Sequence, residues 1–247
     1  MTLPVFISSA NLQPQQTVVL DGDEGHHAVT VRRIRLGEKI ELTDGSGLRA
    51  ICEVVAVGKK SLEAKIESVH TEAKPEVTFT VVQALAKGDR SDLALEILTE
   101  VGVDEITPWS AAHSIAKWDA TDKGLLKWQR IVREASKQAR RAWLPQISTL
   151  HSTAQVAELL ASADLALVLH ESAGDSISEL KVPATGSVVI VVGPEGGISP
   201  EELTAFAGAG ARIVRMGTPV MRTSTAGGVA LGVLMSTTKR WEIPASQ

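Results

Sequence analysis

The sequence has a single cysteine, Cys52, and no long apolar run. One cysteine excludes an internal disulfide and any cysteine-rich metal site, and it fits a reducing compartment. No stretch approaches the roughly 18 apolar residues that a membrane-spanning helix needs, and residues 1–11 lack the basic start of a secretory signal. We therefore expect a cytoplasmic protein with no membrane partner.

Several catalytic and binding motifs are also missing. The chain has no G-x-x-x-x-G-K-[ST] phosphate loop, no H-E-x-x-H zinc motif and no G-x-S-x-G nucleophile elbow. A G-x-G-x-x-A pattern does occur at residues 45–50, but a strand pattern follows it instead of a helix, which indicates a hairpin turn. From the motifs that are missing we expect no metal cofactor.

The overall composition is that of an ordinary globular protein. The chain has 247 residues, a net charge of −4 and 44% hydrophobic residues. This length allows one large domain or two modest ones. The acidic balance argues against indiscriminate nucleic-acid binding, but it leaves room for a local basic surface.

Two different sequence patterns divide the chain near residue 72. Before it, apolar and polar residues alternate in three segments, at 39–43, 48–57 and 62–69. This alternation predicts a small β-rich domain of meander or barrel type. After a polar linker at 70–76, strand and helix patterns alternate: strands at 77–85, 104–108, 146–149 and 165–169, helices at 89–101 and 121–143. Such alternation predicts a parallel sheet covered by helices.

The most unusual stretch covers residues 187–226. An unbroken β-branched run, 188–192, is typical of a strand buried on both faces. A glycine-rich segment at 193–197 ends this strand, and it is either a tight turn or a place where a ligand approaches the backbone closely. Ser199-Pro200-Glu201-Glu202 then predicts a helix that begins with a capping box and needs no phosphate at its N-terminus.

A second loop of small and hydroxyl residues follows a predicted strand at 212–216. This loop, 217–226, leads into a predicted last helix at 227–239. His170-Glu171 follows the strand at 165–169 in the same way. Because ligands bind at the carboxyl ends of strands in open α/β sheets, we expect the three loops to form one pocket.

Basic residues cluster in two places. Arg32, Arg33 and Arg35 lie at the end of a short helix predicted at 24–33. The long predicted helix at 121–143 carries cations at three- and four-residue steps, namely Lys127, Arg130, Arg133, Lys137, Arg140 and Arg141. Each cluster is either a solvated surface or a contact for RNA phosphates, and the pattern alone leaves both interpretations open.

Several segments together resemble the bacterial 16S ribosomal RNA uridine N3-methyltransferase family, within the SPOUT superfamily of trefoil-knotted methyltransferases. Four of them occur in the family's order: KGDRSDLALEILTEVGVDEITPW (87–109), KWQRIVREASKQARRAWLP (127–145), VGPEGGISPEEL (192–203) and MGTPVMRTSTA (216–226). The segment HHAVTVRRIRLGEKIELTDGSG (26–47) is similar to the family's PUA-like barrel. The resemblance implies an α/β fold: a small PUA-like β-barrel domain that binds RNA, residues 1–72, and then a SPOUT methyltransferase domain, residues 73–247. In that domain a trefoil-knotted parallel sheet has helices on both faces.

The resemblance also implies the cofactor and the residues that hold it. S-adenosyl-L-methionine would bind in the three loops, at Leu169, His170, Glu171, Gly193, Gly196, Gly197, Met216, Gly217, Val220, Met221, Thr223, Ser224, Thr225 and Ala226. The chain departs from the family at Ser224, where a glutamate is usual and a serine cannot supply its carboxylate.

The implied reaction is methylation of N3 of a uridine in 16S rRNA. This nitrogen carries a proton and becomes a good nucleophile only as the anion, so the site needs a positive charge and a proton acceptor. We assign the first role to Arg222. Glu195 is either the base, a residue that orients the cofactor, or a side chain that only bonds neighbouring amides.

The implied partners are 16S rRNA within the small ribosomal subunit and a second copy of the chain. The expected RNA-binding residues are Arg32, Arg33, Arg35, Arg90, Arg130, Arg133, Lys137, Arg140 and Arg141. Two other functions stay open. One is a SPOUT methyltransferase that acts on a ribose 2′-hydroxyl or a tRNA base. The other is a catalytically silent RNA-binding protein of ribosome assembly.

Overall fold

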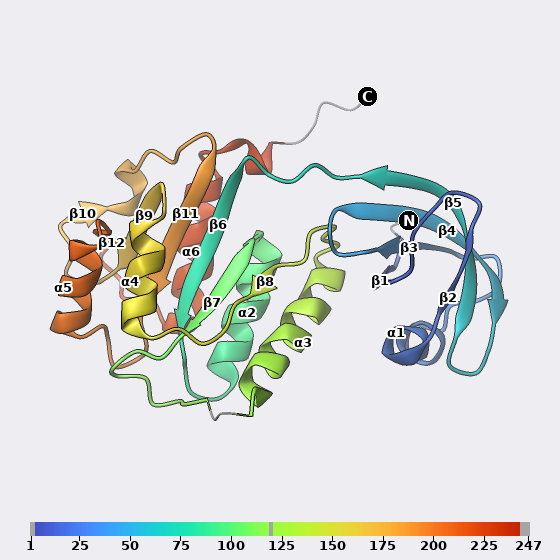
Figure 1. Cartoon of the computed structure of the whole chain (residues 1–247), viewed down its shortest axis with the longest axis horizontal. Helices are drawn as coiled ribbons and strands as arrows, with labels where there is room; N and C mark the ends of the chain where they lie inside the picture. The colour runs from blue at the N-terminus through green and yellow to red at the C-terminus, as the bar shows by residue number, and fades with distance from the viewer. Residues whose placement is uncertain (1–2, 119–120, 243–247) are drawn as a thin grey trace. The chain divides into compact units, whose positions relative to one another are not determined.

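The computed structural model of the chain describes residues 3–118 and 121–242. Internal contacts divide the chain into two units (Figure 1). The first unit comprises the chain up to Lys74 together with Ser136–Leu144, and the second comprises Pro75–Ala135 and the chain from Pro145 onward. The segment Ser136–Leu144 thus packs with the first unit, although the domain boundary expected from the sequence puts it in the second.

The first unit is built on a five-stranded mixed sheet with the order β1-β3-β4-β5-β2. Its strands are β1 (Val5–Ile7), β2 (Thr17–Leu20), β3 (Lys39–Thr43), β4 (Leu48–Val57) and β5 (Leu62–Thr71). In the described chain β1 and β2, at the two ends of this order, do not pair with each other, so the sheet is a half-barrel, in line with the small β-rich unit of meander or barrel type that the sequence predicts.

The alternation that predicted β3, β4 and β5 is confirmed by burial. Every second side chain points into one core, for example Ile40 and Leu42 on β3 and Leu62, Ala64 and Ile66 on β5. This alternation is expected of strands with one buried face. The helix predicted at 24–33 begins and ends two residues earlier: α1 (Gly22–His26) passes into a π-helical turn, His27–Val31.

The segment Ser136–Leu144 is tied to this unit through its backbone and Trp143. The indole N–H of Trp143 donates to the carbonyl oxygen of Glu72 at 2.9 Å, and the amide of Leu144 donates to the carbonyl of Gly45 at 3.0 Å. A β-bridge also joins Trp143 to Ser46.

The second unit is built on seven strands with the order β10-β12-β9-β11-β6-β7-β8, and all the neighbouring pairs are parallel. The strands are β6 (Val77–Ala84), β7 (Glu105–Trp109), β8 (Gln146–Ile147), β9 (Leu165–Leu169), β10 (Asp175–Ser176), β11 (Gly186–Val192) and β12 (Arg212–Arg215). β11 lies between β9 and β6, so both of its edges are paired with other strands.

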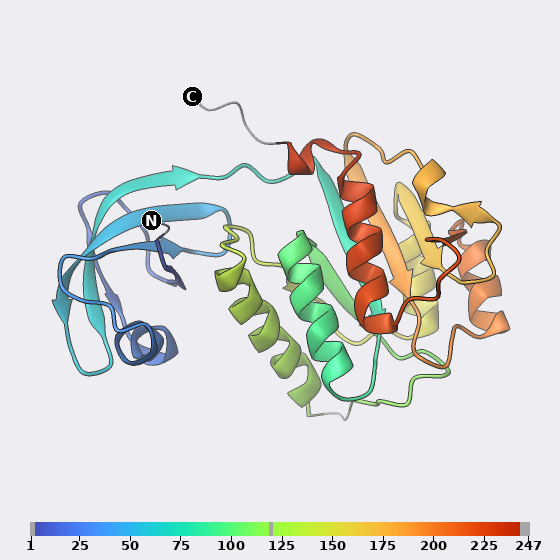
Figure 2. The same cartoon turned by 180° about the vertical axis from the view of Figure 1, so that it is seen from behind.

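Helices cover both faces of this sheet (Figures 1 and 2). Side chains of α2 (Asp89–Val101), α3 (Lys123–Gln138) and α6 (Thr223–Met235) share a core with Val188, Ile190 and Val192 of β11. On the other face, α4 (Thr153–Ala161) and α5 (Pro200–Gly208) pack with Val189 and Val191. Two 3₁₀ turns, Ile177–Glu179 and Lys239–Trp241, complete the elements.

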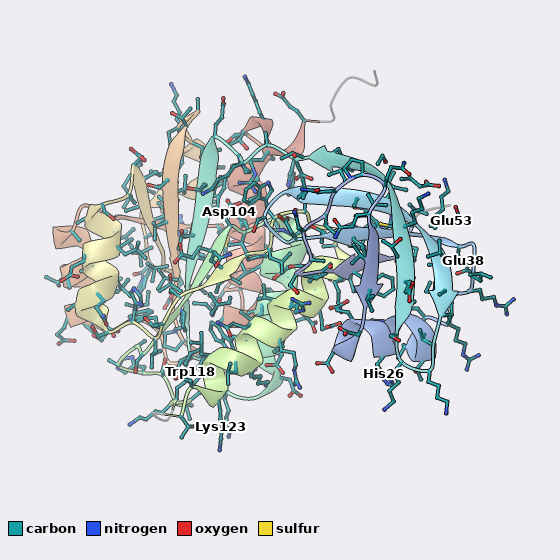
Figure 3. All side chains as sticks on the ribbon, turned by 45° about the vertical axis from the view of Figure 1, so that its right-hand side comes forward. His26, Glu38, Glu53, Asp104, Trp118 and Lys123 are labelled. Carbon is teal, nitrogen blue, oxygen red and sulfur yellow. The ribbon has the colours of Figure 1, made fainter. Side chains whose placement is uncertain are left out.

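A pair of tryptophans fixes the beginning of α3. Trp118, which lies near Lys123 in Figure 3, meets Trp128 edge-on with ring centroids 5.1 Å apart. Trp128 is 2% exposed, so it places one side of α3 in the core. Aromatic pairs of this geometry contribute beyond their buried area, which helps to anchor the helix after its entry loop.

The predicted helix 121–143 is wrong at its end, because α3 stops at Gln138. The amide of Arg140 donates to the carbonyl of Lys137 at 3.2 Å, and the amide of Arg141 donates to that of Ser136 at 2.9 Å. This pair of bonds is a Schellman motif, with Arg140 at the left-handed position (φ 55°) where glycine is usual. Arg140 and Arg141 therefore do not lie on a helical face.

The last helix also begins earlier than predicted. α6 starts at Thr223, so 223–226 form its first turn, not the end of a loop. The helix packs closely on α2, where a Cβ at Gly228 would collide with the side chain of Ile97. Among the helices within residues 3–118 and 121–242, none is both long and apolar enough to cross a membrane.

Candidate functional site

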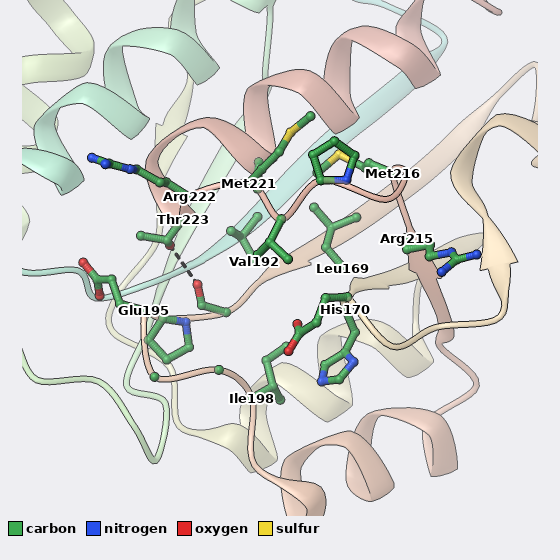
Figure 4. Close-up of a pocket in the computed structure, with 18 of the residues that line it drawn as sticks. Leu169, His170, Val192, Glu195, Ile198, Arg215, Met216, Met221, Arg222 and Thr223 are labelled. Carbon is green, nitrogen blue, oxygen red and sulfur yellow. Dashed lines mark hydrogen bonds between the residues drawn. The ribbon is translucent and has the colours of Figure 1, made fainter.

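A cavity of the second unit lies at the carboxyl ends of three neighbouring strands, β9, β11 and β12 (Figure 4). Its volume is about 530 Å³. The loops that follow these strands surround it, as the sequence pattern predicts. A cavity of this size, formed by loops at a sheet edge, is typical of a small-molecule site.

Most of the residues expected in this pocket do line it. They are Leu169, His170 and Glu171 after β9; Gly193, Glu195, Gly196 and Gly197 after β11; and Met216, Gly217, Val220, Met221, Arg222, Thr223 and Ala226 after β12. Two expected residues do not. Ser224 is buried in the first turn of α6, and the Thr225 hydroxyl donates to the carbonyl of Arg222 at 3.3 Å. Helical geometry turns both side chains away from the cavity.

The sequence analysis missed other residues that line the same cavity. They are Val192, Pro194, Ile198, Val214, Arg215 and Pro219. Four of them, Val192, Pro194, Ile198 and Pro219, lie beside or within the loops expected at 193–197 and 217–226, so their position next to glycines and strand ends was the available signal. Val214 and Arg215 are the last two residues of β12. Arg90, expected as an RNA contact near the pocket, lines the cavity from the first turn of α2.

Close packing explains the glycines of the loop after β11. A Cβ at Gly193 would lie 2.6 Å from Cγ1 of Ile198, and one at Gly196 would lie 2.9 Å from Cβ of His113. His113 also places Nδ1 3.1 Å from the carbonyl oxygen of Gly197. The loop is therefore held as a fixed wall of the pocket instead of a flexible flap.

The capping box predicted at the start of α5 is present. The amide of Glu202 donates to Oγ of Ser199 at 3.2 Å, and the amide of Ser199 donates to Oε2 of Glu202 at 3.0 Å. The other carboxylate oxygen of Glu202 accepts from the Ala112 amide and the Thr153 hydroxyl. Glu202 thus fixes the loop after β11 against two neighbouring segments.

The loop after β12 offers unused backbone groups. In the described chain, Gly217, Thr218, Val220 and Met221 make no main-chain hydrogen bond to another main-chain group. Val220 is also 76% exposed. Met216 and Met221 lie side by side along the same cavity (Figure 4). Apolar surface next to free amides and carbonyls suits a flat polar ring.

Thr223 joins two of the loops. Its hydroxyl donates to the carbonyl oxygen of Gly193 at 2.8 Å and accepts from Nε2 of Gln83 at 3.0 Å (Figure 4 marks the first bond). Gln83 is fully buried at the end of β6. The start of α6 is therefore tied to both the loop after β11 and the central sheet.

Glu195 forms an ion pair with Arg90, Oε1 to Nη1 3.1 Å, and does not bond neighbouring amides in the described chain. Arg222 lies on the same side of the pocket in Figure 4. Its side chain is exposed, and within residues 3–118 and 121–242 it makes no hydrogen bond or ion pair. A carboxylate and a free guanidinium thus stand at one end of the cavity.

The expected RNA-binding cations differ in how far they are exposed to solvent. Arg32, Arg33, Arg35, Arg130 and Arg140 are exposed, whereas Arg133 and Arg141 are half-buried. Lys137 is 7% exposed, and its Nζ lies 3.1 Å from Oε1 of Glu24. The single exposed basic face expected on one helix is therefore not present, because Lys137 points inward and the helix ends before Arg140.

No metal centre is evident in the part of the chain that the structure describes. There, no group of three or more His, Cys, Asp or Glu side chains is arranged to hold an ion.

The chain matches two family models. Residues 73–235 match an RNA methyltransferase domain, and residues 20–67 match an RNA methyltransferase PUA domain.

Curated relatives match over nearly the whole chain. Ribosomal RNA small subunit methyltransferase E of Mycobacterium tuberculosis is 46% identical over 234 residues, which cover 92% of this chain and 89% of that protein. The protein of the same name from Bacillus subtilis is 26% identical over 240 residues, covering 93% and 94%.

Two solved structures are also similar to this chain over nearly its whole length. Ribosomal RNA small subunit methyltransferase E from Neisseria gonorrhoeae, bound to S-adenosyl methionine, is 28% identical with a TM-score of 0.87, covering 95% of this chain and 98% of that one. A methyltransferase from Legionella pneumophila, in complex with the same cofactor, is 27% identical with a TM-score of 0.88, covering 96% and 99%.

Proposed function

This chain belongs to the ribosomal RNA small subunit methyltransferase E family, and from that premise we propose that it methylates N3 of a uridine in 16S rRNA. It is an S-adenosyl-L-methionine-dependent rRNA methyltransferase. Its fold is the predicted class, a PUA-like β unit followed by a SPOUT, trefoil-knotted parallel sheet with helices on both faces. The observation that carries the proposal is the convergence of three strand-end loops on one cavity.

The cavity fits the cofactor by its size and lining. Leu169, Val192, Met216 and Val220 provide apolar walls, and the exposed backbone between residues 217 and 221 provides hydrogen-bonding groups. Bound S-adenosyl-L-methionine supplies an electrophilic methyl group. The protein then has to orient the acceptor base, remove its proton and stabilise the charge that develops.

Arg222 is suited to stabilise that charge. N3 lies between two carbonyl oxygens of the pyrimidine ring, and loss of its proton spreads negative charge onto them. A guanidinium without another partner in the described chain, at the N-terminus of α6, can approach these oxygens without first breaking an ion pair. Both the side chain and the helix dipole favour an anion at this place.

Glu195 is suited to accept the proton, provided that Arg90 moves away. The Arg90–Glu195 pair lies at the pocket and is partly exposed, with side chains 48% and 22% accessible. Exposed pairs contribute little free energy, so RNA phosphate can replace Glu195 as the partner of Arg90. This exchange would free the carboxylate when the substrate arrives.

The substrate base must be unpaired or flipped out, because N3 lies on the Watson–Crick edge. We propose that Arg33, Arg35, Arg130, Arg133 and Arg141 contribute RNA contacts together with Arg32 and Arg140. We also propose that the substrate is 16S rRNA in the context of the small subunit and that the protein acts as a homodimer. Comparison of assembled subunits with naked RNA, and light scattering of the protein, test these two points.

Primer extension tests the reaction itself. N3 methylation blocks base pairing and stops reverse transcriptase at one nucleotide, whereas ribose 2′-O-methylation leaves the pairing edge intact. We expect a cofactor-dependent stop on 16S rRNA at a uridine. Methylation without a stop would identify a ribose methyltransferase. Absence of both methyl transfer and cofactor binding would leave a silent RNA-binding protein.

A further inference from the structure

A second cavity lies entirely within the first unit and is surrounded by basic side chains. Its volume is about 70 Å³. Three segments of the sequence line it, and the lining residues are Leu3, Pro4, Val5, Phe6, His27, Arg32, Lys137, Gln138 and Arg140. We call this cavity the basic recess. None of these described lining residues is acidic, although the chain as a whole has a net charge of −4.

One side of the basic recess is built from the π-helical turn. The amide of Arg32 donates to the carbonyl oxygen of His27 at 2.9 Å, which holds the two residues together at the end of this turn. The ring of His27 meets Phe6 edge-on with centroids 6.1 Å apart, so it is supported from β1. The side chain of Arg32 itself is exposed.

The other side is built from the end of α3. The Schellman motif puts Arg140 in the left-handed region at φ 55°, a conformation that glycine adopts more easily. An arginine in this place keeps a strained backbone and presents an exposed guanidinium at the recess. Strain of this kind at a non-glycine residue is a reason to look for a function of the side chain.

Lys137 lies deeper. Its side chain is 4% exposed and its Nζ is 3.1 Å from Oε1 of Glu24. This ion pair neutralises the acidic group next to the recess. The charges that face solvent are those of Arg32 and Arg140, and neither side chain forms an ion pair or hydrogen bond in the described chain.

We infer that the basic recess binds an internucleotide phosphate of the RNA substrate; this rests on the proposed function. The recess is too small for a base, since small-molecule sites usually measure about 300 Å³ or more. Guanidinium groups match the oxygens of a phosphate bidentately. A phosphate held here contacts the backbone and reads no sequence, so it positions the RNA while the other unit carries the chemistry.

Charge reversal with a matched control tests the assignment. Arg32→Glu and Arg140→Glu are compared with Lys59→Glu and Lys60→Glu, two exposed lysines of the same unit that do not line the recess. Binding of a labelled 16S fragment is measured by fluorescence anisotropy over a range of salt concentrations. Each recess variant should bind about tenfold or more weakly and reduce the salt slope by about one. The lysine variants should change affinity clearly less.

A second variant removes the concern that reversal disturbs folding. Arg140→Gly deletes the guanidinium and relieves the left-handed backbone, so its melting temperature should not fall below that of the wild type. Its RNA affinity should nevertheless decrease. Calorimetry should give unchanged binding of S-adenosyl-L-methionine in all variants, because the reaction cavity lies in the other unit.

Three outcomes overturn the inference. Equal losses of RNA affinity in the recess variants and the lysine variants would show that only the overall charge of the unit affects binding. Unchanged RNA affinity in the recess variants, while the wild type still binds and methylates RNA, would reject the recess and leave the proposed function standing. Saturable binding of inorganic phosphate that is lost in Arg32→Glu, with RNA affinity unchanged, would assign the recess to free phosphate. A wild type that neither binds nor methylates RNA would instead reject the proposed function.

Discussion

Gln83 and Thr223 are 140 residues apart in the sequence, yet Nε2 of Gln83 donates to the hydroxyl of Thr223 at 3.0 Å. The same hydroxyl donates onward to the carbonyl oxygen of Gly193. Gln83 is fully buried, and its Oε1 has no hydrogen-bond partner in the described chain. Burial of the unsatisfied Oε1 costs free energy. The hydrogen bond from Nε2 to Thr223, beside the pocket, offsets this cost.

We therefore predict that Thr223→Val weakens cofactor binding about tenfold, since it removes the bond that joins the loop after β11 to α6. Destabilisation should be about 1–3 kcal/mol, because buried polar groups lose a partner. Thr223→Ser keeps the hydroxyl and should restore affinity. Thr225→Val is the control, as its hydroxyl bonds only within the first turn of α6. Calorimetry and thermal unfolding measure both effects, and equal affinity of the Val and Ser variants would contradict the prediction.

Arg222→Ala should lower the rate of methyl transfer at saturating cofactor by about 10²–10³, the usual loss when one donor to a developing anion is removed. Affinity for S-adenosyl-L-methionine, determined separately by calorimetry, should change only a few-fold. Arg212→Ala is a suitable control, because Arg212 on β12 forms an exposed ion pair with Asp175 on β10 and does not line the cavity. A turnover close to wild type in Arg222→Ala would remove Arg222 from the mechanism.

Glu195→Gln should slow methyl transfer at saturating cofactor and RNA, since the amide cannot accept a proton. Arg90→Ala should weaken RNA binding instead and leave the rate at saturating RNA closer to that of the wild type. Neither change should alter thermal stability by more than about 1 kcal/mol, because the pair is exposed. An unchanged rate of methyl transfer in Glu195→Gln would assign the base to another group.

Local signals predicted much of the site. The β-branched run of β11, the glycines at 193–197 and the capping box at Ser199 lie where the sequence put them. The start of α6 was misplaced because Thr223, Ser224 and Thr225 are weak helix formers. Ser224 itself is buried in that turn, so the family's glutamate at this position has no counterpart facing the cavity.

Other features had no local signal that the analysis could use. Lys137 lies on what reads as a basic helical stripe, but it bonds Glu24, 113 residues away, and only the folded unit brings the two together. The helix end at Arg140 was missed because glycine is the usual left-handed residue. A usable signal was overlooked at α4, whose capping box between Ser152 and Gln155 is complete.

Arg240 should be important for stability. Its guanidinium lies 2.7 and 3.2 Å from the two oxygens of Asp104 and also donates to the carbonyls of Val77 and Gly102. The pair is only 13% and 17% exposed, so loss of the cation leaves a buried carboxylate without its charge partner. We predict that Arg240→Ala lowers the free energy of unfolding by about 3 kcal/mol. Chemical denaturation measures this free energy. Arg212→Ala, which breaks an exposed ion pair, should leave it almost unchanged.

Cys52 lies in the core of the first unit at 0% exposure, and burial raises the pKa of its thiol to about 12. The native protein should therefore react with a thiol reagent only as fast as it unfolds. The folded state holds the thiol proton more tightly than the unfolded state does. Below the unfolded pKa of about 8.5 the thiol is protonated in both states, so Cys52 does not change the free energy of unfolding with pH. As the pH rises from there toward 12, the free energy of unfolding falls. The slope of this decrease approaches about 1.4 kcal/mol per pH unit.

Cys52→Ala should be less stable at neutral pH because of the small cavity, yet lose less stability between pH 8 and pH 10.5. Parallel pH dependence of the two proteins in denaturant titrations would show that the thiol is not the group responsible.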